Sequence, residues 1–232
     1  MVLKVRGLTT RLRVGSSTFK VVDDISFDLH KGKTLALVGK SGCGKSMTAL
    51  SIMRLLAHPP ALPIEGSVLY NGSELLDLSH KEMRAIRGKG IAMIFQDPMN
   101  ALNPVYSIGD QLVEVAEIHL GLYEDEARAC VITALDEVGI ASPEDRLSEY
   151  PHQLSGGMKQ RVMIAMALMC EPDVLIADEP TTALDVTIQA QVLDLMRGLQ
   201  KKKGTAILLI THDTGVVAEL ADEVMVMYSS RE

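Results

Sequence analysis

Short, apolar runs alternate along this chain with longer segments of helical character. Five runs of five residues each are almost entirely apolar, at positions 34–38, 91–95, 174–178, 206–210 and 224–228. Runs of this length are typical of parallel strands that are buried on both faces of a sheet. Helix-compatible segments lie between them, at 47–56, 159–169, 187–203 and 215–220. Because strands that alternate with helices form parallel sheets, the pattern predicts an α/β fold.

The first third of the chain has a different pattern. Residues 2–6 alternate apolar and basic side chains, which indicates an edge strand. Further strands are predicted at 19–22 and 25–29, after a polar turn. A strand at 66–70 leads into Asn71-Gly72, a dipeptide that favours tight hairpin turns. We therefore expect an antiparallel β subdomain packed around the first strand–helix unit of the core.

The middle of the chain reads as a helical subdomain. Ser107 and Asp110 have the spacing of a capping box, which opens a helix with an apolar face reaching Leu120. A second helix is predicted at 124–138, where acidic residues lead and Gly139 follows. We expect one domain over residues 1–232. Its α/β core, with the antiparallel β subdomain, comprises about 1–95 and 160–232, and its inserted helical subdomain comprises about 97–159.

Composition narrows the class of protein. Of 232 residues, 47% are hydrophobic, which supplies a sizeable core, and the net charge of −7 argues against nucleic-acid binding. The three cysteines lie far apart and indicate neither a disulfide framework nor a metal site, which favours a reducing compartment. No apolar run approaches the roughly 20 residues of a membrane helix. We therefore expect that this chain does not span a bilayer by itself, which leaves docking onto a membrane component open.

A glycine-rich loop follows the predicted strand at 34–38 and precedes a predicted helix. It fits the phosphate-binding pattern G-x-x-x-x-G-K-[ST] with Gly39, Lys40, Ser41, Gly42, Cys43, Gly44, Lys45 and Ser46, and Met47 continues into the helix. Glycines let backbone N–H groups approach phosphates closely, and the helix N-terminus adds partial positive charge. Lys45 is expected to reach the β- and γ-phosphates of a nucleotide, and the Ser46 hydroxyl to bind Mg²⁺.

Two adjacent carboxylates end the strand at 174–178. Asp178 is placed to hold Mg²⁺ through its water shell, and Glu179 to act as general base towards water. A second candidate anion site is the segment Ser155, Gly156 and Gly157, which precedes the predicted helix at 159–169. The chain therefore carries two phosphate-binding segments and one acid pair.

Taken in order, these motifs resemble the nucleotide-binding domain of ABC transporters over nearly the whole chain. The loop at 39–46 is similar to Walker A, the strand at 174–178 to Walker B, and residues 154–158 to the signature, with Met158 in place of the usual glutamine. The resemblance implies that Gln96 senses the metal and water, that His212 bonds the γ-phosphate, and that Asp185, in the segment Ala183-Leu184-Asp185, acts across a dimer interface.

In that family two cassettes clamp ATP between Walker A of one chain and the signature of the other. The resemblance therefore implies ATP and Mg²⁺ as cofactors, with Gln96 also near the metal, and contacts from Ser155 and Gly157 to a nucleotide held by a second cassette. The family usually stacks adenine on an aromatic residue upstream of Walker A, and Arg11-Leu12-Arg13 offers none in this chain. Phe19 is the aromatic residue nearby.

Three longer stretches, 96–104, 150–153 and 177–185, resemble the oligopeptide, dipeptide and nickel permease branch. That branch implies a bacterial importer, with two membrane subunits, a second ATPase that is identical or different, a substrate-binding protein acting indirectly, and a place on the cytoplasmic face of the cell membrane. The cargo does not follow from any residue here.

Two other functions are open. A soluble ABC ATPase acting on DNA would have a long coiled coil between its motifs, and residues 72–150 show no sustained heptads. One acting on ribosomes would usually carry two cassettes in one chain. A regulatory cassette without hydrolysis would lack Glu179 or His212, and both are present.

Overall fold

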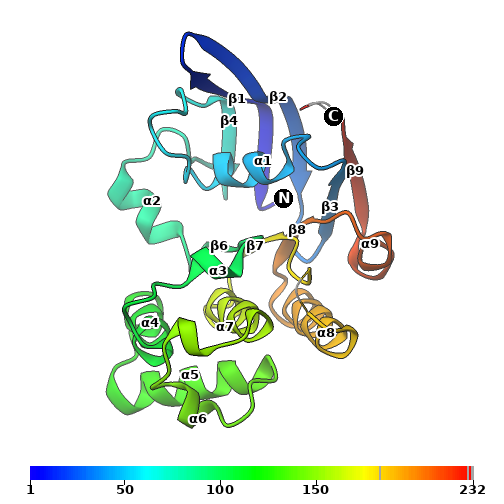
Figure 1. Cartoon of the computed structure of the whole chain (residues 1–232). Helices are drawn as coiled ribbons and strands as arrows, with labels where there is room; N and C mark the ends of the chain where they lie inside the picture. The colour runs from blue at the N-terminus through cyan, green and yellow to red at the C-terminus, as the bar shows by residue number, and fades with distance from the viewer. Residues whose placement is uncertain (183, 229, 231–232) are drawn as a thin grey trace.

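A five-stranded parallel sheet forms the centre of the molecule. The computed structural model describes residues 1–182, 184–228 and 230, and the strand order in this sheet is β6-β7-β8-β3-β9 (Figure 1). Its strands are β3 (Thr34–Gly39), β6 (Ile91–Ile94), β7 (Val174–Asp178), β8 (Ala206–Ile210) and β9 (Glu223–Met227). Each coincides within one or two residues with one of the five apolar runs, so the predicted parallel α/β sheet is confirmed.

A second, antiparallel sheet covers part of the first, in the order β2-β1-β4-β5. Its strands are β1 (Leu3–Val14), β2 (Ser17–Leu29), β4 (Glu65–Tyr70) and β5 (Ser73–Glu74). The turn at Asn71-Gly72 joins β4 to β5 as predicted. The antiparallel β element expected in the first third of the chain is therefore present.

Two details of this sheet differ from the sequence prediction. The segment 2–6 does not form an edge strand, because β1 lies between β2 and β4. Its alternation reflects one solvated face, which a central strand of an antiparallel sheet can also have; Arg6 on that face pairs with Asp28 of β2. The strands expected at 19–22 and 25–29 are one strand, and Asp24, with φ +59°, marks an irregularity in the middle.

Helices pack against the sheets and make up most of the regular structure in the middle of the sequence. They are α1 (Lys45–Ile52), α2 (His80–Ile86), α3 (Pro98–Ala101), α4 (Ile108–Val115), the π-helical turn η1 (Ala116–Leu120), α5 (Glu124–Glu137), α6 (Pro143–Arg146), the 3₁₀ turn η2 (Pro151–Gln153), α7 (Gly156–Leu168), α8 (Val186–Lys203) and α9 (Thr214–Leu220). Ser107 and Asp110 do form a capping box. The first helix is shorter than expected and ends at Ile52.

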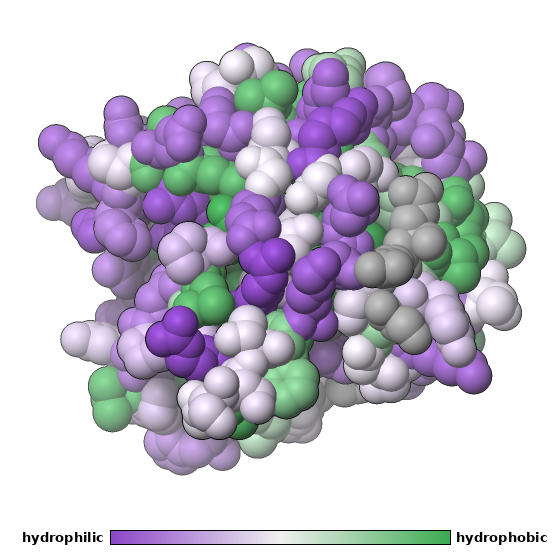
Figure 2. Space-filling view, turned by 90° about the horizontal axis from the view of Figure 1, so that it is seen from above, coloured by the Kyte–Doolittle hydropathy of each residue, from purple (hydrophilic) through white to green (hydrophobic). Residues whose placement is uncertain are grey.

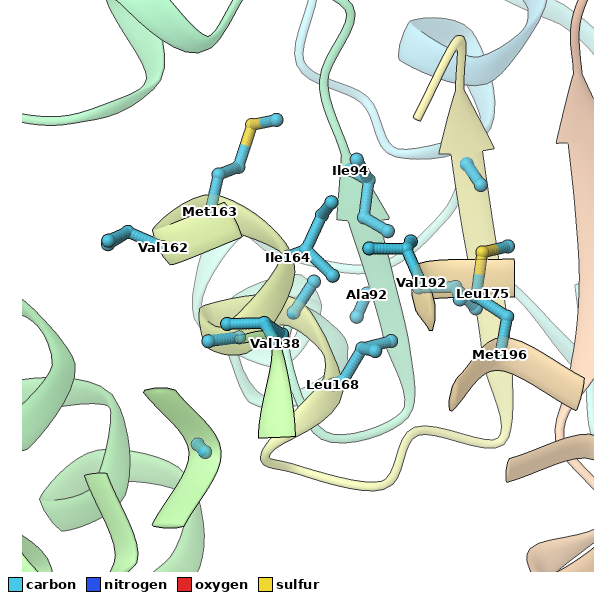
Figure 3. Close-up of a cluster of buried hydrophobic side chains, with 14 of the residues drawn as sticks. Ala92, Ile94, Val138, Val162, Met163, Ile164, Leu168, Leu175, Val192 and Met196 are labelled. Atoms are coloured by element: carbon cyan, nitrogen blue, oxygen red, sulfur yellow. The ribbon is translucent and has the colours of Figure 1, made fainter. Parts of the chain in front are cut away.

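The two faces of the parallel sheet belong to two different cores. Alternate strand residues such as Leu175 and Leu209 pack with α7 and α8, whereas Ile176 and Leu208 pack with α1 and the antiparallel sheet. Figure 3 shows Ile164 and Leu168 of α7 beside Ala92 of β6. Both faces of the sheet are therefore buried, which explains why polar and apolar residues do not alternate along its strands.

The helical part is attached to the sheet by α7. This helix contacts β6, α3, α4 and α5, and its apolar side chains belong to a single core that extends from the sheet to these helices (Figure 3). The division into a core and a helical subdomain at about residues 97–159 stays a prediction. Helix α7 crosses the expected boundary near residue 160.

The face of the molecule that is seen from above is mostly hydrophilic (Figure 2). Seen from above, hydrophobic side chains gather at the right edge of this face, on the side of β9 (Figure 2). Within the described residues, no helix combines the length and the apolar character that crossing a bilayer requires.

Leu208 offers a test of the central sheet. It is fully buried in β8, the middle strand, so Leu208→Ala should lower the free energy of unfolding by about 2–5 kcal/mol, because the removed atoms leave a cavity. Val224→Ala is the control, since Val224 is exposed on the edge strand β9 and should change stability by about 1 kcal/mol or less. Urea unfolding followed by circular dichroism measures both. Equal losses would contradict the assigned burial.

Candidate active site

The phosphate-binding loop joins β3 to α1, and two of its glycines have no room for a side chain. A Cβ on Gly39 would lie 2.4 Å from the carbonyl oxygen of Met227 in β9. A Cβ on Gly44 would lie 2.4 Å from the carbonyl oxygen of Val21, and Gly44 has φ +100°. Substitution at either position would push the loop away from the sheet. The loop is thus fixed by close backbone contact on both sides.

Lys45 lies within this loop rather than extending into solvent. It is 7% exposed, and its Nζ donates hydrogen bonds to the carbonyl oxygens of Gly39 at 2.8 Å and Lys40 at 3.2 Å. The buried thiol of Cys43 is 3.9 Å from the same Nζ. The ammonium group of Lys45 is therefore held at the start of α1. Its charge adds to the partial positive charge of the helix N-terminus.

Asp178 is a buried carboxyl group with one unpaired oxygen. The residue is 2% exposed, and its Oδ1 has no hydrogen-bond partner among the described residues. Burial raises the pKa of this carboxyl group above its ordinary value, and the neighbouring Glu179 adds to the increase, while a hydrogen bond with Ser46 and the charge of Lys45 oppose it. A buried carboxylate oxygen without a donor fits a cation ligand.

Glu179 forms the centre of a hydrogen-bonded group. Its Oε1 is 3.0 Å from Nδ1 of His212. Its Oε2 accepts from Nε2 of Gln96 at 3.1 Å and lies 3.2 Å from the hydroxyl oxygen of Thr182. The Glu179 side chain is 14% exposed and that of His212 is 66% exposed. The carboxylate is therefore largely enclosed, whereas the imidazole remains open to a ligand.

The sheet topology explains why these residues meet. Each of the three residues lies just beyond the end of a strand: Gln96 two positions after β6, Glu179 one position after β7, and His212 two positions after β8. Those strands are neighbours in the sheet and run parallel, so their carboxyl ends lie at one edge, where α/β proteins bind ligands. The phosphate-binding loop follows β3, the next strand at the same edge.

A cavity of about 390 Å³ lies beside this group. It is lined by Ser46, Gln96 and Asp178, the three residues predicted to be near a metal, and by apolar side chains that include Leu50 and Phe95. A larger cavity of about 860 Å³ lies between α5 and α8 and contains none of the predicted catalytic or metal-binding residues. Of these two cavities, the smaller one therefore holds the predicted metal-binding residues.

Other predicted residues lie elsewhere in the chain. Ser155, Gly156 and Gly157 begin α7, in the opposite half of the molecule from α1 (Figure 1). The Ser155 hydroxyl accepts from the amide of Met158 at 3.3 Å, so it caps its own helix. The two segments predicted to bind phosphate are thus separated within one chain.

Asp185 and Phe19 were also predicted to contribute to nucleotide binding. Asp185 caps α8 by accepting from the amides of Thr187 and Ile188, both at 3.1 Å; Ala183 of the same predicted segment lies outside the described residues. Phe19 is exposed on β2, two residues before Val21, which touches the loop at Gly44. Met47 is half-buried in the first turn of α1. Asp185, Phe19 and Met47 form no hydrogen bond with Glu179, Gln96 or His212 among the described residues.

Thr182 is a site residue that the sequence reasoning did not single out. It belongs to the stretch at 177–185, but no spacing or pattern in the sequence indicates that its hydroxyl reaches Glu179. Glu179 itself has φ +48°, the left-handed region that non-glycine residues seldom adopt. Neither feature has a signal in the order of residue types.

The strand–loop–helix around Lys45, with an acid pair at the end of the buried strand β7 in the same sheet, defines a P-loop nucleotide triphosphatase. A family model described as "ABC transporter" matches residues 22–182. The chain therefore belongs to the ABC transporter family, and it is an ATPase of that family.

Curated proteins of similar sequence align with almost the whole of this chain. It is 54% identical over 230 residues to the dipeptide transport ATP-binding protein DppD of Bacillus subtilis, covering 99% of this chain and 69% of that protein. It is 50% identical over 229 residues to the oligopeptide transport ATP-binding protein OppD of the same organism, covering 99% and 64%.

A solved structure has the same fold. The ATP-binding cassette MJ0796, a dimer in a post-hydrolysis state bound to ADP and Pi, superposes with a TM-score of 0.87 at 25% identity, covering 99% of this chain and 95% of that one. The expected ABC ATPase fold is therefore confirmed.

Asp178 provides a test of metal binding. Asp178→Asn removes the buried charge, so the Mg²⁺-dependent gain in ATP affinity should fall about ten- to a hundred-fold, the usual effect of losing a residue that orients bound metal. Affinity measured by fluorescent-nucleotide titration with Mg²⁺ and with EDTA gives this gain. Asp77→Asn, an exposed acid outside the site, is the control. An unchanged Mg²⁺ effect in Asp178→Asn would contradict the assignment.

Proposed function

We propose that this chain is the ATP-hydrolysing subunit of a bacterial peptide importer and works as half of a cassette dimer. The observation that carries the proposal is the enclosed carboxylate of Glu179, bonded by Gln96 and His212 beside Lys45 and Asp178. Peptides are favoured as cargo by the names of the two Bacillus relatives, which span dipeptide and oligopeptide transport. Nickel, the other cargo expected from the sequence, has no comparable support.

The residues of this chain divide the chemistry among them. Glu179 takes a proton from the attacking water, because its carboxylate is the base that Gln96, Thr182 and His212 hold at the carboxyl ends of the strands. His212 is exposed enough to bond the γ-phosphate, and Gln96 orients water at the cavity. Lys45 and the N-terminus of α1 stabilise charge on the phosphates. Ser46 and Asp178 would hold Mg²⁺, which supplies further charge neutralisation when bound.

Two cassettes are required because each chain holds only part of the nucleotide site. Ser155 and Gly157 begin α7, which lies in the other half of the molecule from α1 (Figure 1), so they would contact a nucleotide held by a second chain. The dimeric state of the MJ0796 cassette supports this arrangement. Asp185 would act at the same interface. The second cassette is either a copy of this chain or a relative.

The complete transporter would add two membrane subunits and, indirectly, a substrate-binding protein. The cassettes would then lie at the cytoplasmic face of the cell membrane, where ATP is available. Gln96 is the link to the membrane subunits in this scheme, because it touches Glu179 and precedes the loop at 97–104. A soluble ATPase acting on DNA or ribosomes is not favoured by the relatives, which are named for transport.

Glu179→Gln tests the general base. Turnover should fall by about 10²–10⁴-fold, the usual contribution of general base catalysis, while ATP affinity stays near that of the natural chain. With ATP the variant should accumulate as a dimer, because the bound triphosphate is not consumed; light scattering after size exclusion measures this. Glu144→Gln, on the exposed helix α6, is the control. Full turnover in Glu179→Gln would remove Glu179 from the mechanism.

Cargo can be tested in the native host. Deleting the gene should abolish uptake of labelled di- or oligopeptides, and restoring the natural chain should recover it, whereas Lys45→Ala should not, because the phosphates lose their main cation. Nickel uptake measured in the same cells should be unchanged by the deletion. Loss of nickel uptake with normal peptide uptake would contradict a peptide cargo.

A further inference from the structure

Thr182 contacts Glu179 in two ways. Its hydroxyl oxygen lies 3.2 Å from Oε2 of the Glu179 carboxylate and 3.3 Å from the Glu179 carbonyl oxygen. A hydroxyl has one hydrogen to donate, so both acceptors compete for it or share it. The charged carboxylate is the stronger acceptor. Thr182 is therefore a hydrogen-bond donor to the atom that Gln96 bonds from the other side.

The backbone at Glu179 needs such support. Glu179 has φ +48°, and residues without the freedom of glycine keep this conformation only where their surroundings impose it. The Glu179 amide donates to Ile210 at 2.8 Å, and the amide of Thr182 lies 3.4 Å from the Glu179 carbonyl oxygen. The second distance is long, so the Thr182 hydroxyl strengthens a turn that its amide closes weakly.

The turn that contains Thr182 also connects Glu179 to the segment before α8. The amide of Leu184 donates to the carbonyl of Thr181 at 3.1 Å, and Asp185 then caps α8. Among the described residues, three side chains contact the Glu179 carboxylate. Gln96 and His212 follow the strands on either side of β7. Thr182 instead belongs to the same turn as Glu179. Its hydroxyl can therefore fix the carboxylate independently of any movement of the other two.

We propose that Thr182 is a positioning residue for Glu179: its hydroxyl fixes the orientation of the carboxylate so that a lone pair of Oε1 or Oε2 faces the attacking water. This inference rests on the proposed role of Glu179 as general base. It assigns no contact between Thr182 and the nucleotide. Removing the hydroxyl should therefore lower kcat and leave ATP affinity unchanged, since the hydrogen bond acts on the base alone.

The test compares Thr182→Val, which keeps the shape and removes the donor, with Thr182→Ser, which keeps the donor. In the assembled transporter, kcat should fall about tenfold in Thr182→Val, as expected for losing a hydrogen bond to a charged group. KM and the affinity for a fluorescent ATP analogue should be unchanged. Thr182→Ser should stay within about twofold of the natural chain. Thr182→Ala, which also lacks the hydroxyl, is the second variant should Thr182→Val fail to fold.

A double-mutant cycle separates positioning from a structural role. Single-turnover hydrolysis is measured in Glu179→Ala with and without Thr182→Val. If Thr182 acts through Glu179, the second substitution should not lower the residual rate further, because there is no carboxylate to hold. ATP-dependent dimerisation in the Glu179→Gln background should also be the same with and without Thr182→Val.

Each other result overturns the inference. If Thr182→Val has the kcat of the natural chain while Glu179→Ala is inactive, Thr182 is not a positioning residue, and the proposed function is unaffected. An equal rate loss from Thr182→Val in the Glu179→Ala background, or a loss of dimerisation, would assign Thr182 to the interface or to the fold instead. Full activity in Glu179→Ala would overturn the role of Glu179 together with that of Thr182.

Discussion

The register of three parallel strands is the constraint on which the active site depends. Ile94 of β6 lies opposite Ala177 of β7, and Asp178 lies opposite Ile210 of β8. This alignment brings the residues just beyond the strands to one edge, where Gln96 and His212 reach opposite oxygens of Glu179 at 3.1 and 3.0 Å. A shift of one position in either strand would turn these side chains to the other face.

That register is fixed because both faces of the sheet are buried. Leu175 and Leu209 face α7 and α8, whereas Ile176 and Leu208 face the antiparallel sheet and α1. Slipping a strand would exchange two sets of apolar contacts at once, so packing on either side opposes it. The same burial removes water from Asp178 and raises the pKa of its carboxyl group. One structural feature thus sets both the geometry and the electrostatics of the site.

The sequence predicts the parallel strands well and their surroundings less well. Runs such as 206–210 are apolar throughout because the sheet is dry on both faces, and this signal is local. The prediction that β1 is an edge strand was wrong. Alternation of apolar and polar residues shows which face of a strand is solvated, but it does not show which strands pair with that strand. The division of β2 was wrong for a related reason, since one residue at φ +59° interrupts the pattern without ending the strand.

At the site, Lys45, Asp178, Glu179, Gln96 and His212 could be named from motifs. What the motifs do not contain is the set of bonds among them. The contact of Thr182 with Glu179 depends on the left-handed backbone at Glu179, and residue types alone do not encode that conformation. The orphaned oxygen of Asp178 is likewise a property of packing, because it depends on which donors the folded chain leaves out of reach.

The separation of the two segments that are predicted to bind phosphate has a consequence for how a nucleotide would be enclosed. Lys45 is bonded inside its own loop and Ser155 caps a helix in the other half of the molecule, so neither completes a site with the other in one chain. Charge on a bound triphosphate would be neutralised from one side only. A second helix N-terminus approaching from a neighbouring chain would supply the missing side. Association and nucleotide binding would therefore favour each other, and hydrolysis at Glu179 would remove the group that joins them.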